Sequence, residues 1–290
     1  MRLLAVANAR AGRAGAAAAL ERVCRLLRAG GAEVRLEEAD SAAECLSLSR
    51  RAASEQWDGL LACGGDGMAH WAAQGLAGSQ TPLAMLPAGR GNDLARNLNL
   101  PQTAEGCAAA ILARKTRRLD LLSSRAGWIL NVAGAGFDAE INRLANRLAW
   151  PRGRAAYSLA LLGVLSRLQA RHFHIIADGE TVWSGPAITA VVANGPAYGG
   201  GFRIAPAARF DDGRLDLVLV REVRRGALLR ALPSLYRGAH GSHPAVRMLQ
   251  AIQVRIESDP PAPVYADGEP FGTTPLEVKT VPVALRVFTP

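Results

Sequence analysis

The sequence has little of what membrane-spanning, secreted and zinc-binding proteins need. No apolar run approaches the roughly eighteen residues required to cross a bilayer. The opening apolar run ends after Ala7, so the first residues are not typical of a secretory signal. The cysteines form no C-x-x-C pair and have no histidine at zinc-like spacing. We therefore expect a cytoplasmic protein that meets any membrane from outside. Its thiols should be small buried residues, namely Cys24, Cys45, Cys63 and Cys107.

Lysine is almost absent, occurring only at Lys115 and Lys279, so arginine carries nearly all the positive charge. The formal net charge is +9, which suits nucleic acid, an anionic membrane surface or phosphorylated substrates. An arginine-rich composition alone would also produce this charge. The sequence contains no helix-turn-helix, RNA-binding aromatic motif or zinc module, so we expect no nucleic-acid partner.

The first third of the chain alternates short apolar runs with helical patterns, which is typical of a parallel sheet covered by helices on both faces. We predict a Rossmann-like α/β nucleotide-binding domain over residues 1–122. Its predicted strands are Leu3–Ala7, Glu33–Glu37, Gly59–Cys63 and Pro82–Leu86. Its predicted helices are Ala16–Arg28, Ser41–Ser54 with a serine cap, Ala69–Ala77, and one that begins at Asp93.

Beyond Leu119 the runs become short and β-rich, with Gly, Pro and Asp between them. This pattern predicts a β-sandwich-like second domain over residues 123–290, with one helical insertion at Ala155–Gln169. The predicted strands include Trp128–Val132, Ala187–Val192, Arg214–Val220, Ala251–Glu257 and Val283–Phe288.

Two glycine-rich loops follow neighbouring predicted strands of the first domain. The first is Gly-Gly-Asp-Gly and the second is Pro-Ala-Gly-Arg-Gly-Asn-Asp. Glycines let a backbone approach phosphate closely, and the helix that follows adds its positive end. Tight turns use the same residues, but two such loops at one sheet edge favour nucleotide binding. Neither loop matches the P-loop or the G-x-G-x-x-G fingerprint.

Five blocks together resemble the catalytic domain of diacylglycerol kinases and related lipid kinases such as sphingosine kinases. Each block alone is a weak signal, but all five occur in the family order. The blocks are GGDG at 64–67, LPAGRGNDLAR at 86–96, NVAGAGFDAE at 131–140, ANGPAYGGGFRIAP at 193–206 running into FDDGRLD at 210–216, and YADGEP at 265–270.

The resemblance implies an ATP-dependent phosphotransferase that modifies a lipid hydroxyl, such as that of diacylglycerol. It places the nucleotide phosphates at the two glycine-rich loops, at the turn that follows the first loop, and at the end of the first strand. The implied nucleotide-binding residues are Asn8, Arg10, Gly64, Gly65, Asp66, Gly67, Met68, His70, Trp71, Gly89, Arg90, Gly91, Asn92 and Asp93.

The same resemblance implies a structural Mg²⁺ at Asp212, assisted by the backbone carbonyls of Arg209 and Arg214. It favours Glu269 as the general base that accepts the proton of the lipid hydroxyl. In an extended chain Asp267 and Glu269 point the same way, so the residues alone leave Asp267 open as the base.

The sequence departs from the family pattern around the phosphates. Met68 stands in place of a threonine, His70 and Trp71 in place of an Asn-Glu pair, and Arg90 in place of another threonine. Arg90 is able to compensate, because a guanidinium binds phosphate oxygens in a fork. The departures leave open a catalytically impaired nucleotide- and lipid-binding relative. A kinase for a soluble hydroxyl acceptor is a further alternative.

A lipid substrate requires contact with a membrane surface. A basic and apolar stretch runs from Arg143 to Tyr157, and its composition suits an anionic bilayer as well as an ordinary amphipathic helix. The expected partners are therefore a nucleotide and a lipid at a membrane surface. The resemblance is also compatible with a homodimer.

Overall fold

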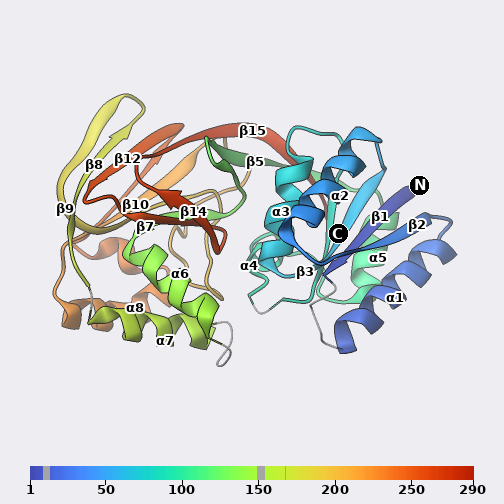
Figure 1. The fold of residues 1–290 in the computed structure, drawn as a ribbon, viewed down its shortest axis with the longest axis horizontal. Coiled ribbons are helices and arrows are strands. Elements are labelled where there is room, and N and C mark those ends of the chain that lie inside the picture. The colour runs from blue at the N-terminus through green and yellow to red at the C-terminus, as the bar shows by residue number, and fades with distance from the viewer. Residues whose placement is uncertain (9–13, 90, 149–153, 167) are drawn as a thin grey trace. The chain divides into compact units, whose positions relative to one another are not determined.

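The computed structural model describes residues 1–8, 14–89, 91–148, 154–166 and 168–290 (Figure 1). These residues form two compact units. Unit 1 comprises residues 1–121 with 282–290, and unit 2 comprises residues 122–281. Of the predicted site residues, Arg10 and Arg90 lie outside the described residues.

Unit 1 is built on a parallel sheet in the order β2-β1-β3-β4, to which the end of β15 adds next to β4. The inner strands β1, β3 and β4 are nearly continuous apolar runs because helices cover both faces of the sheet, whereas β2 at the edge is mostly charged and largely exposed. The strands are β1 (Arg2–Asn8), β2 (Glu33–Ala39), β3 (Gly59–Gly64), β4 (Leu83–Pro87) and β15 (Leu276–Phe288). Strand β5 (Thr116–Ser124) pairs with β15 and leads into unit 2.

Helices α1 and α5 pack together on one face of this sheet, and α2 and α3 pack together on the other (Figure 1). Ser41 caps α2 by accepting a hydrogen bond from the Glu44 backbone N–H, as the sequence predicted. The helices are α1 (Ala14–Ala29), α2 (Ala42–Ser54), α3 (Asp66–Leu76), α4 (Asp93–Asn97) and α5 (Ala104–Leu112). All four cysteines are buried in unit 1, as predicted.

Unit 2 consists of antiparallel strands that share the long strand β9 (Glu180–Ala193). The first half of β9 pairs with β8, which leads through β12 to β15. Its second half pairs with β7 on one side and with β10 on the other. The remaining strands are β6 (Gly127–Ile129), β7 (Val132–Gly136), β8 (Arg171–Ala177), β10 (Leu215–Arg221), β11 (Val246–Ala251), β12 (Gln253–Asp259), β13 (Pro263–Ala266) and β14 (Glu269–Thr273).

These topologies confirm the predicted fold class, a parallel-sheet α/β domain followed by a β-sandwich-like domain. The prediction of a single helical insertion in the second domain was wrong. Unit 2 contains α6 (Phe137–Arg147), α7 (Arg154–Leu165) and α8 (Arg225–Arg237), and a short 3₁₀ turn at His240–Ser242. Helix α6 was not predicted because it starts directly at the end of β7, inside a glycine-rich stretch. Helix α8 escaped because Pro233 lies within it. None of the described helices is long and apolar enough to cross a membrane.

Candidate functional site

The two glycine-rich loops lie side by side at the carboxyl edge of the unit 1 sheet. Strands β3 and β4 end level with each other, because Gly64 pairs in register with Pro87. The Ala88 backbone N–H then donates to the Gly64 carbonyl at 2.8 Å. Helix α3 begins within the first loop, at Asp66, with Gly65 at its N-cap. Backbone donors at the start of α3 therefore project from the same edge as the second loop.

The second loop closes on itself and touches the first. Asn92 adopts a left-handed conformation with a φ of 55°, and its Oδ1 accepts a hydrogen bond from the Gly89 N–H at 2.9 Å. A Cβ atom added at Gly89 would overlap the Cα atom of Gly65. Only glycine at position 89 lets the two backbones come this close.

Asp66 and Asp93 form a carboxylate pair beneath these loops. Asp66 Oδ1 accepts a hydrogen bond from the Leu94 backbone N–H at 3.2 Å, which ties the first loop to the start of α4. Asp93 Oδ1 accepts from Arg96 Nη2 at 2.7 Å. Burial, and secondly the charge of Asp93, raise the pKa of the Asp66 carboxyl to about 6. Two neighbouring carboxylates of this kind suit a cation bound beside phosphate oxygens.

We expect that replacing Asp93 with Asn will lower the pKa of Asp66, because a like charge is removed. The folded protein keeps the Asp66 proton at pH values where the unfolded chain has released it. Its unfolding free energy therefore falls as pH rises from 3.8 to about 6. Carboxyl NMR titration should place the Asp66 midpoint lower in D93N, and the D93N stability should vary less over this range. An unchanged midpoint would contradict the coupling of the two carboxyls.

Other residues expected at the nucleotide lie in different surroundings. The side chains of Met68 and His70 are buried, at 8% and 2% exposure. Met68 contacts Cys45 of α2, and the His70 ring meets the Trp71 ring edge-on with centroids 5.0 Å apart. Asn8 is exposed at the carboxyl end of β1. The structure thus brings together the loop residues at 64–67, 89 and 91–93, whereas the Met68 and His70 side chains belong to the packing around α3.

In unit 2 the two candidate bases differ in their surroundings. Asp267 stands at a tight turn between β13 and β14 with a φ of 51°. Its carboxylate accepts hydrogen bonds from the backbone N–H groups of Leu130, Asn131 and Val132, at 2.8 Å, 2.8 Å and 3.0 Å. Glu269 follows as the first residue of β14 and is partly exposed. The Asp267 carboxylate therefore holds the backbone in place.

The turn that precedes Glu269 is also held from α6. Asn146 Nδ2 donates a hydrogen bond to the Gly268 carbonyl at 2.6 Å. Together with the Asp267 bonds, this contact fixes the backbone on both sides of residue 268. Because the backbone before it is fixed, the Glu269 side chain can be oriented toward a substrate with little loss of conformational freedom.

The predicted metal position lies at a turn before β10. Asp212 Oδ1 accepts the Arg214 backbone N–H at 3.0 Å, and Gln250 Nε2 lies 3.4 Å from both Asp212 Oδ2 and Asp216 Oδ2. Burial raises the pKa of Asp216, and the Asp212 charge adds to this effect. Arg209 lies beside the turn, where its Nε is 3.5 Å from Asp211.

Two facing carboxylates offer the hard oxygen ligands that Mg²⁺ prefers. Among the described residues, no cluster of three or more His, Cys, Asp and Glu side chains could hold a metal. A magnesium ion here would therefore complete its shell with backbone carbonyls and water, which is usual for Mg²⁺.

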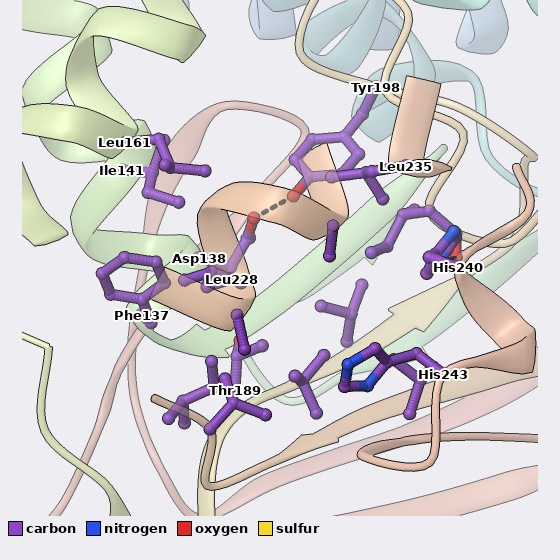
Figure 2. A pocket seen from close by; sticks show the side chains of 18 residues that line it. Phe137, Asp138, Ile141, Leu161, Thr189, Tyr198, Leu228, Leu235, His240 and His243 are labelled. Atoms are coloured by element: carbon purple, nitrogen blue, oxygen red, sulfur yellow. Dashed lines mark hydrogen bonds between the residues drawn. The ribbon is translucent and has the colours of Figure 1, made fainter. Parts of the chain in front are cut away.

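Unit 2 also contains a cavity of about 100 Å³ between its helices and its sheet. Figure 2 shows Phe137, Ile141 and Leu161 on one side of it and His240 and His243 on the other. Nearly the whole lining is apolar. The lining residues are Phe137, Asp138, Ile141, Leu161, Ile188, Thr189, Val191, Tyr198, Ile204, Val220, Val223, Ala227, Leu228, Ala231, Leu235, His240, His243 and Val246.

One buried carboxyl, that of Asp138, stands in the cavity wall. Tyr198 donates its hydroxyl to Asp138 Oδ1, drawn as the dashed line in Figure 2, and Asn142 Nδ2 donates to Oδ2 at 3.2 Å. Burial raises the pKa of Asp138 to about 6. A Cβ atom at Gly134 would overlap this carboxyl, so the absence of a side chain at Gly134 makes its space. Asp138 belongs to the block at 131–140, but no role for it was predicted from the sequence.

The first and second parts of the chain each match a different domain of known proteins. Residues 2–124 match the diacylglycerol kinase catalytic domain, and residues 131–289 match the YegS C-terminal NAD kinase beta sandwich-like domain. A protein named diacylglycerol kinase from Mycobacterium tuberculosis (strain ATCC 25618 / H37Rv) is 38% identical over 249 residues, covering 84% of this chain and 80% of that protein. The chain belongs to the diacylglycerol kinase family.

A further relative is a lipid kinase by name, and solved structures share the fold. A probable lipid kinase YegS-like protein from Pseudomonas aeruginosa (strain UCBPP-PA14) is 31% identical, covering 80% of this chain and 76% of that protein. A solved putative diacylglycerol kinase from Bacillus anthracis str. Sterne covers 100% of this chain and 97% of its own, with a TM-score of 0.83 at 21% identity. An NAD kinase from Archaeoglobus fulgidus, solved in complex with ATP, shares the fold at a TM-score of 0.57 and 14% identity, covering 100% of this chain and 94% of its own.

As a member of the diacylglycerol kinase family, the chain is a phosphotransferase that uses an alcohol group as acceptor. The resemblance stated from the five blocks is thereby confirmed. The pairing of Asp66 with Asp93 and the cavity around Asp138 were not predicted. The only sequence signal for the first was an acidic residue in each glycine-rich loop.

Proposed function

We propose that this kinase transfers the γ-phosphoryl group of ATP to the hydroxyl of a lipid such as diacylglycerol at a membrane surface. The observation that carries this proposal is the apolar cavity of unit 2. A soluble polyol offers nothing that an apolar wall could bind favourably, whereas a hydrocarbon chain gains from leaving water there. The cavity therefore favours a lipid acceptor over a soluble one.

We assign nucleotide binding to the first domain, residues 1–122. Backbone N–H groups at Gly65, Asp66 and Gly67 and around Gly89 would hold the phosphate oxygens. The fold is shared with a kinase solved with ATP, which supports the same donor. Asp66 and Asp93 would hold the catalytic Mg²⁺, which supplies charge neutralisation when bound. The second domain, residues 123–290, would bind the lipid.

Glu269 is the proposed general base. It follows a turn that is braced at residues 267 and 268, and its side chain is not enclosed in the core. Asp267 is the weaker candidate, because proton transfer to its carboxylate would disturb three backbone hydrogen bonds. Asp212, with the carbonyls of Arg209 and Arg214, remains the proposed structural Mg²⁺ site, and the Asp216 carboxyl, which shares Gln250 with Asp212, offers a further oxygen ligand there.

The test of this function is transfer of labelled phosphate from ATP to a lipid panel in mixed micelles. The panel should contain diacylglycerols of increasing chain length, a sphingoid base and glycerol as a soluble acceptor. Transfer that improves with chain length and is absent with glycerol would support the proposal. Efficient transfer to glycerol would favour the soluble-acceptor alternative, and no transfer despite nucleotide binding would favour the impaired relative.

A bulky side chain in the cavity should lower the activity toward lipids with long acyl chains. Ala231 of α8 lines the cavity, so A231W places a large ring where a hydrocarbon chain would lie. We expect kcat/KM for a long-chain diacylglycerol to fall on the order of 100-fold, while ATP affinity stays unchanged. The matched control is A18W on the exposed surface of α1, which should have no effect. An unaffected long-chain kcat/KM in folded A231W would contradict the use of this cavity.

A further inference from the structure

Two helices that enclose the cavity also carry exposed apolar side chains on their outer side. On α7, Leu161 lines the cavity, whereas Leu159 and Leu162 are 46% and 52% exposed. On α8, Leu228 and Leu235 line the cavity, whereas Leu229 is 37% exposed. Each helix is thus apolar on two sides, although a helix on the surface of a soluble protein normally buries one. Large leucines that stay exposed on two helices of one unit favour an interaction surface there.

Helices α7 and α8 belong to one surface. Figure 1 shows them next to each other along one edge of unit 2. The Ser158 hydroxyl of α7 and the Tyr236 hydroxyl of α8 are hydrogen-bonded at 2.8 Å. We name the docking face by its exposed residues, which are Leu159, Leu162, Leu229, Arg225, Arg230 and Arg237.

Helices α7 and α8 carry charge of one sign. The sequence contains no Asp or Glu from residue 141 to 177 or from residue 223 to 256, and these stretches include both helices. Arg225, Arg230 and Arg237 are exposed on α8 and form no ion pair within the described residues. Arginine stems cover apolar surface while their guanidinium groups reach phosphate oxygens. This combination of leucine and unpaired arginine complements a bilayer that contains anionic lipid.

We propose that the docking face lies on an anionic membrane and that the lipid acceptor passes from the bilayer between α7 and α8 into the cavity. The inference rests on the proposed lipid kinase function, because it uses the same cavity. The leucine side chains would insert at the boundary between the lipid headgroups and the acyl chains, and the arginines would pair with lipid phosphates.

Vesicle flotation without nucleotide tests the docking face directly. The probe is phosphatidylcholine vesicles with and without phosphatidylglycerol. We expect wild-type protein to bind the anionic vesicles, and binding to weaken with salt. Both R225E/R230E and L159S/L162S should bind these vesicles roughly tenfold more weakly. The matched controls are R25E/R50E on the exposed surfaces of α1 and α2, and L36S on β2, where Leu36 is 45% exposed; these should bind like wild type.

Activity assays with diacylglycerol in vesicles and with dispersed diacylglycerol distinguish a failure of the docking face from a failure of the lipid kinase function. With diacylglycerol embedded in anionic vesicles, the docking-face variants should lose activity in step with binding. With dispersed short-chain diacylglycerol, their kcat should stay within about twofold of wild type. Failure of wild type to phosphorylate either form would refute the lipid kinase function. Normal transfer with vesicle binding unchanged in both variants would refute only the docking face.

A second copy of the chain is the competing occupant of this surface. Light scattering should give the same mass for wild type and for both docking-face variants. A dimer that dissociates in L159S/L162S, with vesicle binding unchanged, would overturn the membrane assignment in favour of self-association.

Discussion

Replacing Glu269 with Gln is expected to lower kcat by about 10²–10⁴-fold, which is the usual contribution of a general base. Glutamine keeps the size and hydrogen-bonding reach of the side chain but cannot accept the proton of the attacking hydroxyl. The turn before it, held by Asp267 and Asn146, should keep its shape. ATP affinity, measured by calorimetry, should therefore stay close to that of wild type.

The matched variant is D267N, which should fail in a different way. Asparagine has one carbonyl oxygen and no charge, so it cannot replace a carboxylate that accepts three backbone hydrogen bonds. We expect D267N to lose about 2 kcal/mol or more of unfolding free energy in denaturant titration. If D267N instead kept its stability and lost turnover, while E269Q remained active, the base would be Asp267.

Gly89→Ala is expected to have the second large effect, on nucleotide binding. The added Cβ would overlap the Cα atom of Gly65 and lie 3.1 Å from its nitrogen. Both obstacles are backbone, so no change of rotamer relieves them and the two loops must separate. We expect ATP affinity to fall on the order of 100-fold, because the donors that surround the phosphates are misplaced. The strain should also cost about 1–3 kcal/mol of stability.

G15A provides the control for this prediction. Gly15 is an exposed residue of α1, and a Cβ atom there meets nothing within 4 Å. Alanine should leave ATP affinity unchanged and raise helix stability slightly. If G89A bound ATP as tightly as G15A, the close approach of the two loops would not matter for the nucleotide.

Much of unit 1 could be predicted because its signals are local. The β3 strand and its glycine turn, and the α2 helix with its Ser41 cap, are each specified by a few adjacent residues. In unit 2 the local signals mislead. Gly134 and Gly136 suggest strand and turn, yet α6 begins at the very next residue, with Gly136 at a φ of 92°. Pro233 suggests a break, yet α8 continues through it.

The sequence by itself determined the family, the fold class and the two glycine-rich loops, because motifs and hydrophobic periodicity are carried by neighbouring residues. Only the tertiary structure decided what Asp267 does, since its carboxylate is bound by backbone N–H groups up to 137 positions away. The same holds for the cavity, whose lining extends from Phe137 to Val246. It also holds for the pKa of Asp66, which depends on burial and on Asp93 in another loop. Such contacts form only when distant segments pack, and no local pattern encodes their distance or their burial.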